Sequence, residues 1–123
     1  MITGRVTPSP ELQVSVRLRG PGGNDTAEDA VIDTGFDGQL LLPDNVIGYL
    51  NLNFVRVSKL RLVDGSIGNA ALYEADIEWN GVWRSLIAWG LGKQVLIGMK
   101  LLTGYRLTAD IVPGGLVQLE PLP

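Results

Sequence analysis

The 123-residue chain contains no cysteine and no histidine. Without these residues, Ser-His-Asp triads, Cys-His dyads and zinc sites built from His or Cys are excluded. Carboxylates, lysine and tyrosine remain for acid–base chemistry, so an enzyme of this composition would most readily use Asp or Glu. The absence of cysteine also fits the cytosol, where thiols are kept reduced.

Other features are missing as well. No apolar run approaches the length needed to cross a bilayer, and residues 1–5 show no hydrophobic core of a signal peptide. The formal net charge is −3 and no basic stripe stands out, which argues against nucleic acid and anionic membranes as partners. We therefore expect a cytoplasmic protein with no nucleic-acid or membrane partner.

What is present indicates one compact all-β domain. Hydrophobic residues make up 46% of the chain and charged residues 19%, a composition typical of a globular protein. Residues 11–19 alternate between polar and apolar side chains, which predicts a half-buried strand. Turn signals lie at 20–25, 80–81 and 113–115. Many short strands with regular turns indicate a β-barrel or sandwich with little helix.

Further elements follow from local patterns. The expected elements are a short edge strand at 2–6, a second hairpin arm at 27–33, one or two helical turns at 43–50, a long hairpin with arms 54–63 and 69–79, a buried strand at 95–97 followed by a short helix that ends at Gly104, and a final hairpin with arms 105–112 and 116–119. We expect the tail, 120–123, to be loose.

Residues 30–43 place an aspartate between two apolar runs. An apolar, β-branched run leads into Asp33-Thr34-Gly35, and Leu40–Leu42 follows the turn. A carboxylate at the end of an apolar strand loses hydration, and hydrogen bonds or a shared proton must compensate. Thr34 can donate a hydroxyl hydrogen bond, and Gly35 lets backbone pass close to the carboxylate. An ordinary turn is the alternative, since Asp, Thr and Gly are all common in turns.

Three features occur in one order along the chain: the Asp33-Thr34-Gly35 turn, the glycine-tipped hairpin Asp64–Gly68, and Leu96-Ile97-Gly98 before a short helix with Leu101 and Leu102. In this order the chain resembles, over about residues 12–119, the retropepsin-like aspartic proteases, small single-domain proteases of retroviruses and many microbes. It is most similar to microbial members with Asp-Thr-Gly-Phe. The resemblance implies one domain over 1–123, folded as a closed acid-protease β-barrel with one or two short helices and one lobe per chain.

The resemblance also assigns roles to residues. It makes Asp33 the catalytic acid within the motif completed by Thr34 and Gly35. It makes a flap of Asp64, Gly65, Ser66, Ile67 and Gly68, and it assigns Phe36, Ile97 and Gly98 to the cleft, with the last two packed beneath the acid. It implies no metal and no cofactor.

One such motif per chain implies a homodimer. The chain is too short for two lobes, so a two-fold axis would set Asp33 opposite its mate. Two close carboxylates share a proton and titrate as a pair. Water between them would attack a peptide bond, under a closing flap. Extended, apolar peptides or protein segments that pair with sheet edges are the expected substrates of this aspartic endopeptidase.

Two positions depart from the family pattern. Phe36 stands where relatives usually have a small residue, and a ring beside the acid could reshape the cleft. Lys100 stands where relatives often have Asp or Asn. The alternative function is a catalytically silent β-barrel dimer that binds a peptide or protein partner through the same cleft.

Other residues carry weaker hypotheses. Asp110 could form an intramolecular acid pair, although it lacks the Thr-Gly turn. A Ser-Lys dyad remains open, with Lys59, Lys93 or Lys100 as its base, but no local signature supports it. For Trp79, Trp83 and Trp89 we expect packing in the core or a dimer rather than ligand stacking.

Overall fold

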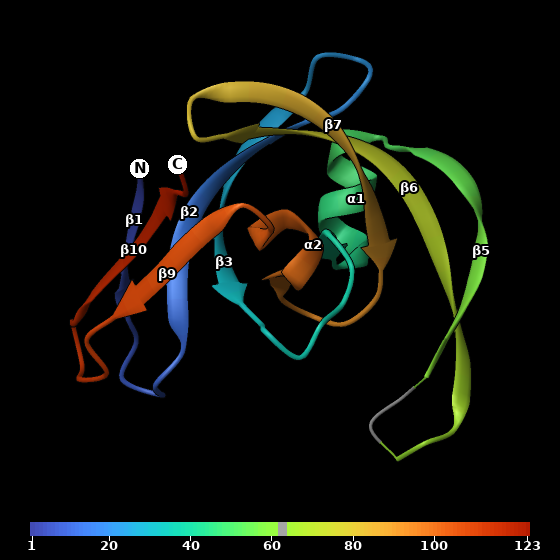
Figure 1. The fold of residues 1–123 in the computed structure, drawn as a ribbon. Helices are drawn as coiled ribbons and strands as arrows, with labels where there is room; N and C mark the ends of the chain where they lie inside the picture. Colours follow the sequence, from blue (N-terminus) through green and yellow to red (C-terminus); the bar gives the residue numbers. More distant parts are fainter. Residues whose placement is uncertain (62–63) are drawn as a thin grey trace.

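The computed structural model describes residues 1–61 and 64–123 (Figure 1). The elements of this part, in chain order, are β1 (Ile2–Val6), β2 (Leu12–Arg19), β3 (Asp25–Ile32), β4 (Leu40–Leu42), α1 (Asp44–Leu50), β5 (Asn53–Arg61), β6 (Ile67–Trp79), β7 (Val82–Gly90), β8 (Val95–Ile97), α2 (Met99–Leu102), β9 (Tyr105–Ala109) and β10 (Leu116–Pro121). The expected all-β fold with short helices is confirmed.

Six strands form a closed barrel. They follow one another in the order β6, β7, β4, β8, β3 and β2, and β2 pairs back onto β6. The closing pairs include Leu18 opposite Ile77 and Arg19 opposite Asp76, and the Arg19 guanidinium lies 3.3 Å from an Asp76 carboxylate oxygen. The ring leaves no free edge among these six strands, so their backbone hydrogen bonds are satisfied around the barrel.

The barrel interior is filled by the alternating apolar side chains of its strands. Leu18 and Ile77 are fully buried at the seam. Helix α1 packs an apolar face of Val46, Ile47 and Leu50 onto the core. The buried core residues of the barrel strands include Val14, Val16, Leu18, Ala30, Ile32, Leu40, Leu42, Ala75, Ile77, Leu86, Ala88, Val95 and Ile97.

Two extensions leave the barrel, and Figure 1 shows them on opposite sides of α2. On one side β5 pairs with β6 alone and forms a long hairpin with it. On the other side β1, β10 and β9 continue the sheet from β2. The ladder ends at β5 and β9, which are therefore the two edges of the sheet among the described residues.

Two expectations about the termini are wrong. Residues 2–6 form no edge strand, because β1 pairs with both β2 and β10. The tail is not loose up to its last residues, because Pro121 pairs with Tyr105 and the Leu122 N–H donates to Gly104 O at 2.9 Å. Proline is accommodated because Pro121 is the last residue of its strand. The β1–β10 ladder joins the two ends of the chain, which no local pattern reveals.

The hairpin turns agree with the sequence. Asn80 and Gly81 both have positive φ, 52° and 82°, as the turn type typical of Asn-Gly requires. The expected strand 54–63 corresponds to β5 as far as Arg61, and its last two residues, 62 and 63, lie outside the described part.

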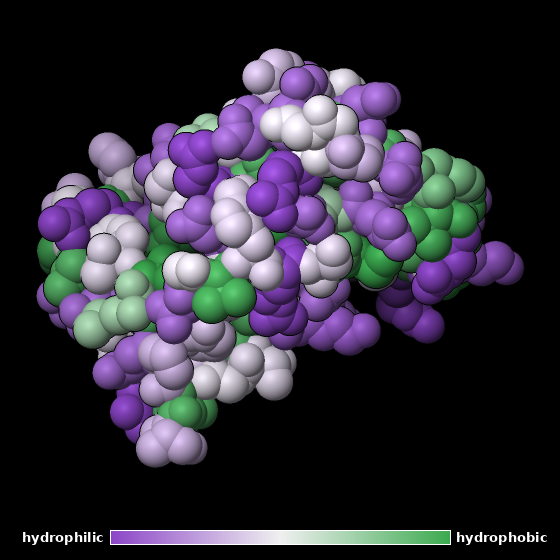
Figure 2. Space-filling view, turned by 90° about the horizontal axis from the view of Figure 1, so that it is seen from above, coloured by the Kyte–Doolittle hydropathy of each residue, from purple (hydrophilic) through white to green (hydrophobic). Residues whose placement is uncertain are grey.

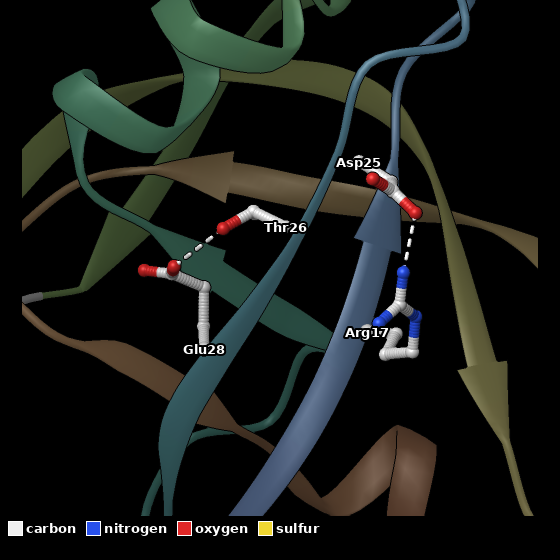
Figure 3. A network of polar contacts seen from close by, with 4 residues as sticks. All are labelled: Arg17, Asp25, Thr26 and Glu28. Carbon is white, nitrogen blue, oxygen red and sulfur yellow. Dashed lines mark hydrogen bonds and ion pairs between the residues drawn. The ribbon is translucent and has the colours of Figure 1, made fainter.

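Polar side chains lie on both faces of the β2–β3 hairpin, with Arg17 and Asp25 on the outer face and Thr26 and Glu28 on the face toward α1 (Figure 3). Arg17 forms an ion pair with Asp25 across the two strands, with both side chains about half exposed. The Thr26 hydroxyl donates to a Glu28 carboxylate oxygen at 2.8 Å. A solvent-exposed ion pair such as Arg17–Asp25 contributes little to stability, so the hairpin is held mainly by its backbone ladder and buried residues.

The upper surface is mostly polar, but apolar residues gather on the side where β5 and β6 lie (Figure 2). Phe54 and Val57 of β5 are 59% and 58% exposed, and the Phe54 and Tyr73 rings meet edge to face, with centroids 6.0 Å apart.

Among the described residues, neither helix has the length and apolarity to cross a membrane.

The seam between β2 and β6 should be sensitive to lost volume. We expect Leu18→Ala to lower the free energy of unfolding by about 2–5 kcal/mol, because a fully buried leucine leaves a cavity. Val82→Ala is the control, since Val82 is 65% exposed and should change stability by no more than about 0.5 kcal/mol. Urea denaturation followed by circular dichroism measures both, and equal losses would contradict the assigned seam.

Candidate active site

The site is built where β8 runs between β3 and β4. Ile97 of β8 pairs in parallel with Ile32 of β3 and antiparallel with Leu40 of β4. Because β3 and β8 are parallel, their carboxyl ends meet at one edge of the sheet. Asp33 follows β3 and Gly98 follows β8, so the two residues become neighbours although 65 positions separate them in the sequence.

Backbone hydrogen bonds tie the acid loop, residues 33–39, to the start of α2. The Asp33 N–H donates to Ile97 O at 2.9 Å, and the Gly98 N–H donates to Gln39 O at 3.1 Å. The Met99 N–H donates to Phe36 O at 2.8 Å. These bonds hold both ends and the middle of the loop, so the position of the acid is fixed by backbone contacts.

The Asp33 side chain is half-buried, and one of its oxygens is engaged. Oδ1 accepts a hydrogen bond of 2.9 Å from the Gly35 N–H, and no other described residue bonds this carboxylate. Thr34 is exposed, and its hydroxyl makes no hydrogen bond within the described residues. The partner of the carboxylate is therefore the backbone of Gly35 rather than the hydroxyl of Thr34.

Gly98 allows the loop and α2 to approach. A Cβ on Gly98 would lie 2.2 Å from Gly38 O and 2.6 Å from Cδ2 of Phe36. A Cβ on Gly38 would likewise lie 2.6 Å from Cζ of the Phe36 ring. The ring thus occupies the space left by two glycines, which explains how a phenylalanine fits directly after Gly35.

Phe36 also contacts Trp89 of β7. The two rings meet edge to face, with centroids 5.4 Å apart and planes at 84°, a favourable arrangement of aromatic quadrupoles. The structure places Trp79 in the core and Trp83 beneath the Arg19 guanidinium, 4.1 Å from its ring centroid. Core packing is thus confirmed for Trp79 alone, whereas Trp83 is partly exposed against an arginine and Trp89 lies on the surface of the cleft described next.

The β5 arm of the hairpin and the acid loop enclose two hollows. Hollow A has a volume of about 260 Å³ and is lined by Asp37, Gly38, Gln39, Arg56, Ser58, Leu72, Ile87, Trp89 and Lys100. Hollow B has a volume of about 320 Å³ and is lined by Gly35, Phe36, Asp37, Leu41, Lys59, Leu60, Arg61, Trp89 and Leu91. Trp89 and Asp37 border both, so the hollows form one cleft that begins two residues after Asp33.

The residues expected to form a flap lie at the tip of the β5–β6 hairpin. Asp64, Gly65 and Ser66 form the turn, and Ile67 and Gly68 begin β6. None of these five lines hollow A or B. Residues of β5 line both hollows together with the acid loop, while the tip of the hairpin projects away from the barrel (Figure 1).

Hydrogen bonds shape the hairpin turn. The Ser66 N–H and hydroxyl donate to Asp64 Oδ1 at 2.9 Å and 2.6 Å. Both bonds favour the ionised carboxylate, first the hydroxyl and then the N–H, and they hold the pKa of Asp64 below its ordinary value. The turn is thus pinned by its own aspartate.

The structure brings the Asp33-Thr34-Gly35 motif together with Ile97 and Gly98. These last two residues are buried beneath the acid and do not line the hollows. The sequence did not single out Gln39, whose Oε1 accepts the Ile87 N–H at 3.0 Å. Its role depends on β7 running beside β4, a pairing without a local signal.

The weaker hypotheses gain no support. Asp110 lies exposed at the end of β9 on the side of the β1–β10 arm and lines neither hollow. Ser58 and Lys100 both line hollow A, but the Ser58 hydroxyl bonds the Lys59 carbonyl oxygen at 3.4 Å. Among the described residues no serine bonds a lysine amine.

A third hollow lies on the other side of the acid loop. Hollow C has a volume of about 310 Å³ and is lined by Thr34, Met99, Leu102, Thr103, Gly104, Tyr105 and Leu107. It lies between the acid loop, α2 and β9, whereas hollows A and B face β5. Met99 is 46% exposed here, so apolar surface adjoins the acid motif.

Comparison with known proteins defines the class of fold. No protein-family model matches the chain, and no curated protein sequence matches it. A retropepsin-like aspartic protease from Rickettsia conorii aligns with a TM-score of 0.62 over 99% of this chain and 92% of its own, at 14% identity. EIAV protease in complex with the inhibitor HBY-793 aligns with a TM-score of 0.58 over 77% of this chain and 88% of its own, at 16% identity. The chain has the fold of the retropepsin-like aspartic proteases.

The close approach at Gly98 yields a test. Gly98→Ala should lower the free energy of unfolding by about 1–3 kcal/mol, because its Cβ would meet backbone oxygens that cannot move aside. Gly48→Ala is the control, and it should change the free energy of unfolding in the opposite direction. Gly48 lies in α1, where an added Cβ would meet nothing within 4 Å, so alanine should stabilise by about 0.5–1 kcal/mol. Chemical denaturation measures both, and a neutral Gly98→Ala would contradict the packing.

The hairpin turn yields a second test. Ser66→Ala should raise the pKa of Asp64 toward its ordinary value, because the hydroxyl bond is the larger cause of the lowering. With the folded pKa below the unfolded one, the stability contributed by this turn is present above the unfolded pKa and is lost as pH falls through the folded pKa. NMR titration of the carboxyl carbon measures the shift. Ser58→Ala is the control, and an unchanged Asp64 pKa in Ser66→Ala would refute the assignment.

Proposed function

We propose that this chain is an aspartic endopeptidase that acts as a homodimer through Asp33 of each copy. One observation carries the proposal. Backbone hydrogen bonds to the end of β8 fix the position of Asp33, and its side chain is half exposed. Among the described residues only its Oδ1 accepts a hydrogen bond. The protease fold supports this function, and the sequence offers no histidine or cysteine as a competing nucleophile system.

The chemistry follows from two carboxylates held close. They cannot both ionise easily, so the pair holds one proton. The ionised acid takes a proton from water as the water oxygen attacks the peptide carbonyl carbon, and the protonated acid donates its proton to the carbonyl oxygen. The diol then breaks its C–N bond: the protonated acid donates its proton to the leaving nitrogen, a diol hydroxyl gives its proton to the other acid as the carbonyl re-forms, and the pair again holds one proton.

We place the dimer contact at hollow C. Thr34 and Met99 border it, so a second copy seated there would lie beside the acid and bring its own Asp33 near. The terminal strands β1 and β10 already pair with each other inside one chain, and their ladder therefore needs no partner. The apolar lining offers surface whose burial favours association.

The substrate would lie across hollows A and B. An extended peptide segment entering between β5 and the acid loop meets both hollows, with Trp89 and Phe36 between them. Side chains of the peptide would enter the hollows, while the hairpin closes over the chain and excludes water. The substrate class is therefore a peptide or an extended protein segment.

Substitution of the acid tests the proposal. We expect Asp33→Asn to lower peptide hydrolysis by at least about 10²-fold, because an amide can neither take the proton from water nor share one with its mate. Hydrolysis of an unbiased peptide library is measured from about pH 4, close to the ordinary pKa of a carboxyl group, up to about pH 7. Asp110→Asn is the matched control, since Asp110 is exposed and lines neither hollow.

Mixing the two proteins tests the shared site. A large excess of Asp33→Asn added to the wild type should suppress hydrolysis, because mixed dimers hold one acid, whereas Asp110→Asn in the same excess should not. Hydrolysis retained by Asp33→Asn would move the chemistry elsewhere. A stable dimer that binds peptides and cleaves none would identify the alternative, a binding module that uses the same cleft.

A further inference from the structure

We propose that the cleft selects peptides with acidic side chains beside the scissile bond. The inference rests on the proposed function and adds the chemical class of its substrate. Four cations line the cleft: Arg56 and Lys100 in hollow A, and Lys59 and Arg61 in hollow B. Arg56 pairs with the buried Leu72 and lies on the inward face of β5, whereas Lys59 and Arg61 lie on its outward face at the rim of hollow B. The inward-facing positive charge is therefore that of hollow A.

The charge of the cleft is opposite to that of the chain. The formal net charge of the whole protein is −3, yet among the described residues Asp37 is the single carboxylate that lines hollow A or B. The remaining lining consists of glycine, apolar residues, Gln39 and Ser58. Positive charge is thus concentrated where the substrate would lie, and a cleft focuses such a field better than an open surface.

These four cations are free to meet an incoming carboxylate. The ion pairs among the described residues are Arg17–Asp25 and Arg19–Asp76, and both lie away from the cleft. All four cleft cations are exposed in the absence of substrate. Although Asp37 borders both hollows, it lies within 4.0 Å of none of their amine or guanidinium nitrogens.

Hollow A combines cations from two elements. Arg56 comes from β5, where it pairs with the buried Leu72 and so faces the barrel side, and Lys100 comes from α2. In the extended substrate expected here, a glutamate or aspartate entering hollow A would meet a cation from each element. Lys100 stands where relatives often have Asp or Asn. In this arrangement the lysine contributes to the preference for acidic peptides instead of disrupting the site.

The test compares isosteric peptides. A peptide cleaved in the library experiment is made with Glu or Gln at each position flanking the cleavage site. We expect kcat/KM to be about fivefold higher for each Glu than for Gln at low salt. Raising the ionic strength to about 0.5 M should shrink this ratio, because salt screens exposed charges.

Variants assign the preference to the cleft. Arg56→Gln and Lys100→Gln should each reduce the Glu/Gln ratio, and Asp37→Asn should increase it, because the one opposing charge is removed. Arg56→Glu should turn the preference toward lysine at the same substrate position. Arg84→Gln and Arg106→Gln are matched controls, since both arginines are exposed and line neither hollow. Circular dichroism and unfolding curves check that each variant is folded.

The outcomes separate this inference from the proposed function. Cleavage with equal rates for Glu and Gln peptides, or a Glu preference unchanged in Arg56→Gln and Lys100→Gln, would overturn the inference and leave the endopeptidase intact. If nothing is cleaved, the same peptides are tested for binding by calorimetry. If Glu peptides bind more tightly than Gln peptides and Arg56→Gln loses this difference, the cleft selects acidic peptides but the endopeptidase proposal is refuted. If there is neither cleavage nor selective binding, the inference and the proposed function are both overturned.

Discussion

The hydrogen bond from the Asp33 N–H to Ile97 O joins two parts of the chain on which the rest of the site depends. It exists because β8 runs beside β3 in parallel, so that both strands end at the same edge. Gly98 then turns the chain into α2 at a point where a Cβ would lie 2.2 Å from Gly38 O. A buried strand and one glycine thereby position a carboxylate that has no side-chain partner among the residues that the structure describes.

Packing around Phe36 shows how the site accommodates a residue that is large for its place. The ring lies over Gly38 and Gly98, and its edge-to-face contact with Trp89 fixes it against β7. Trp89 borders both hollows and Phe36 borders hollow B, so the aromatic pair forms part of the wall of the cleft. Gly38 and Phe36 are coupled, because a side chain at position 38 would compete for the volume of the ring.

Local patterns predicted much of the fold. Alternation over 11–19 and the Asn80-Gly81 turn correspond to β2 and the β6–β7 hairpin, because periodicity and backbone torsions act over a few residues. The same reasoning misassigned 2–6 as an edge strand and the tail as loose. The first error comes from the β1–β10 ladder, which joins residues at opposite ends of the chain. The second comes from the β9–β10 ladder, which extends to Pro121.

By itself, the sequence determined the strands, most of the turns, an aspartate at the end of an apolar strand, and the absence of His and Cys chemistry. Tertiary structure alone decided that β2 closes onto β6, that Trp89 borders the cleft, and that cations of β5 and α2 share one hollow. The reason is physical. Propensity and periodicity are properties of neighbouring residues, whereas strand register and charge clustering arise only when distant segments pack together.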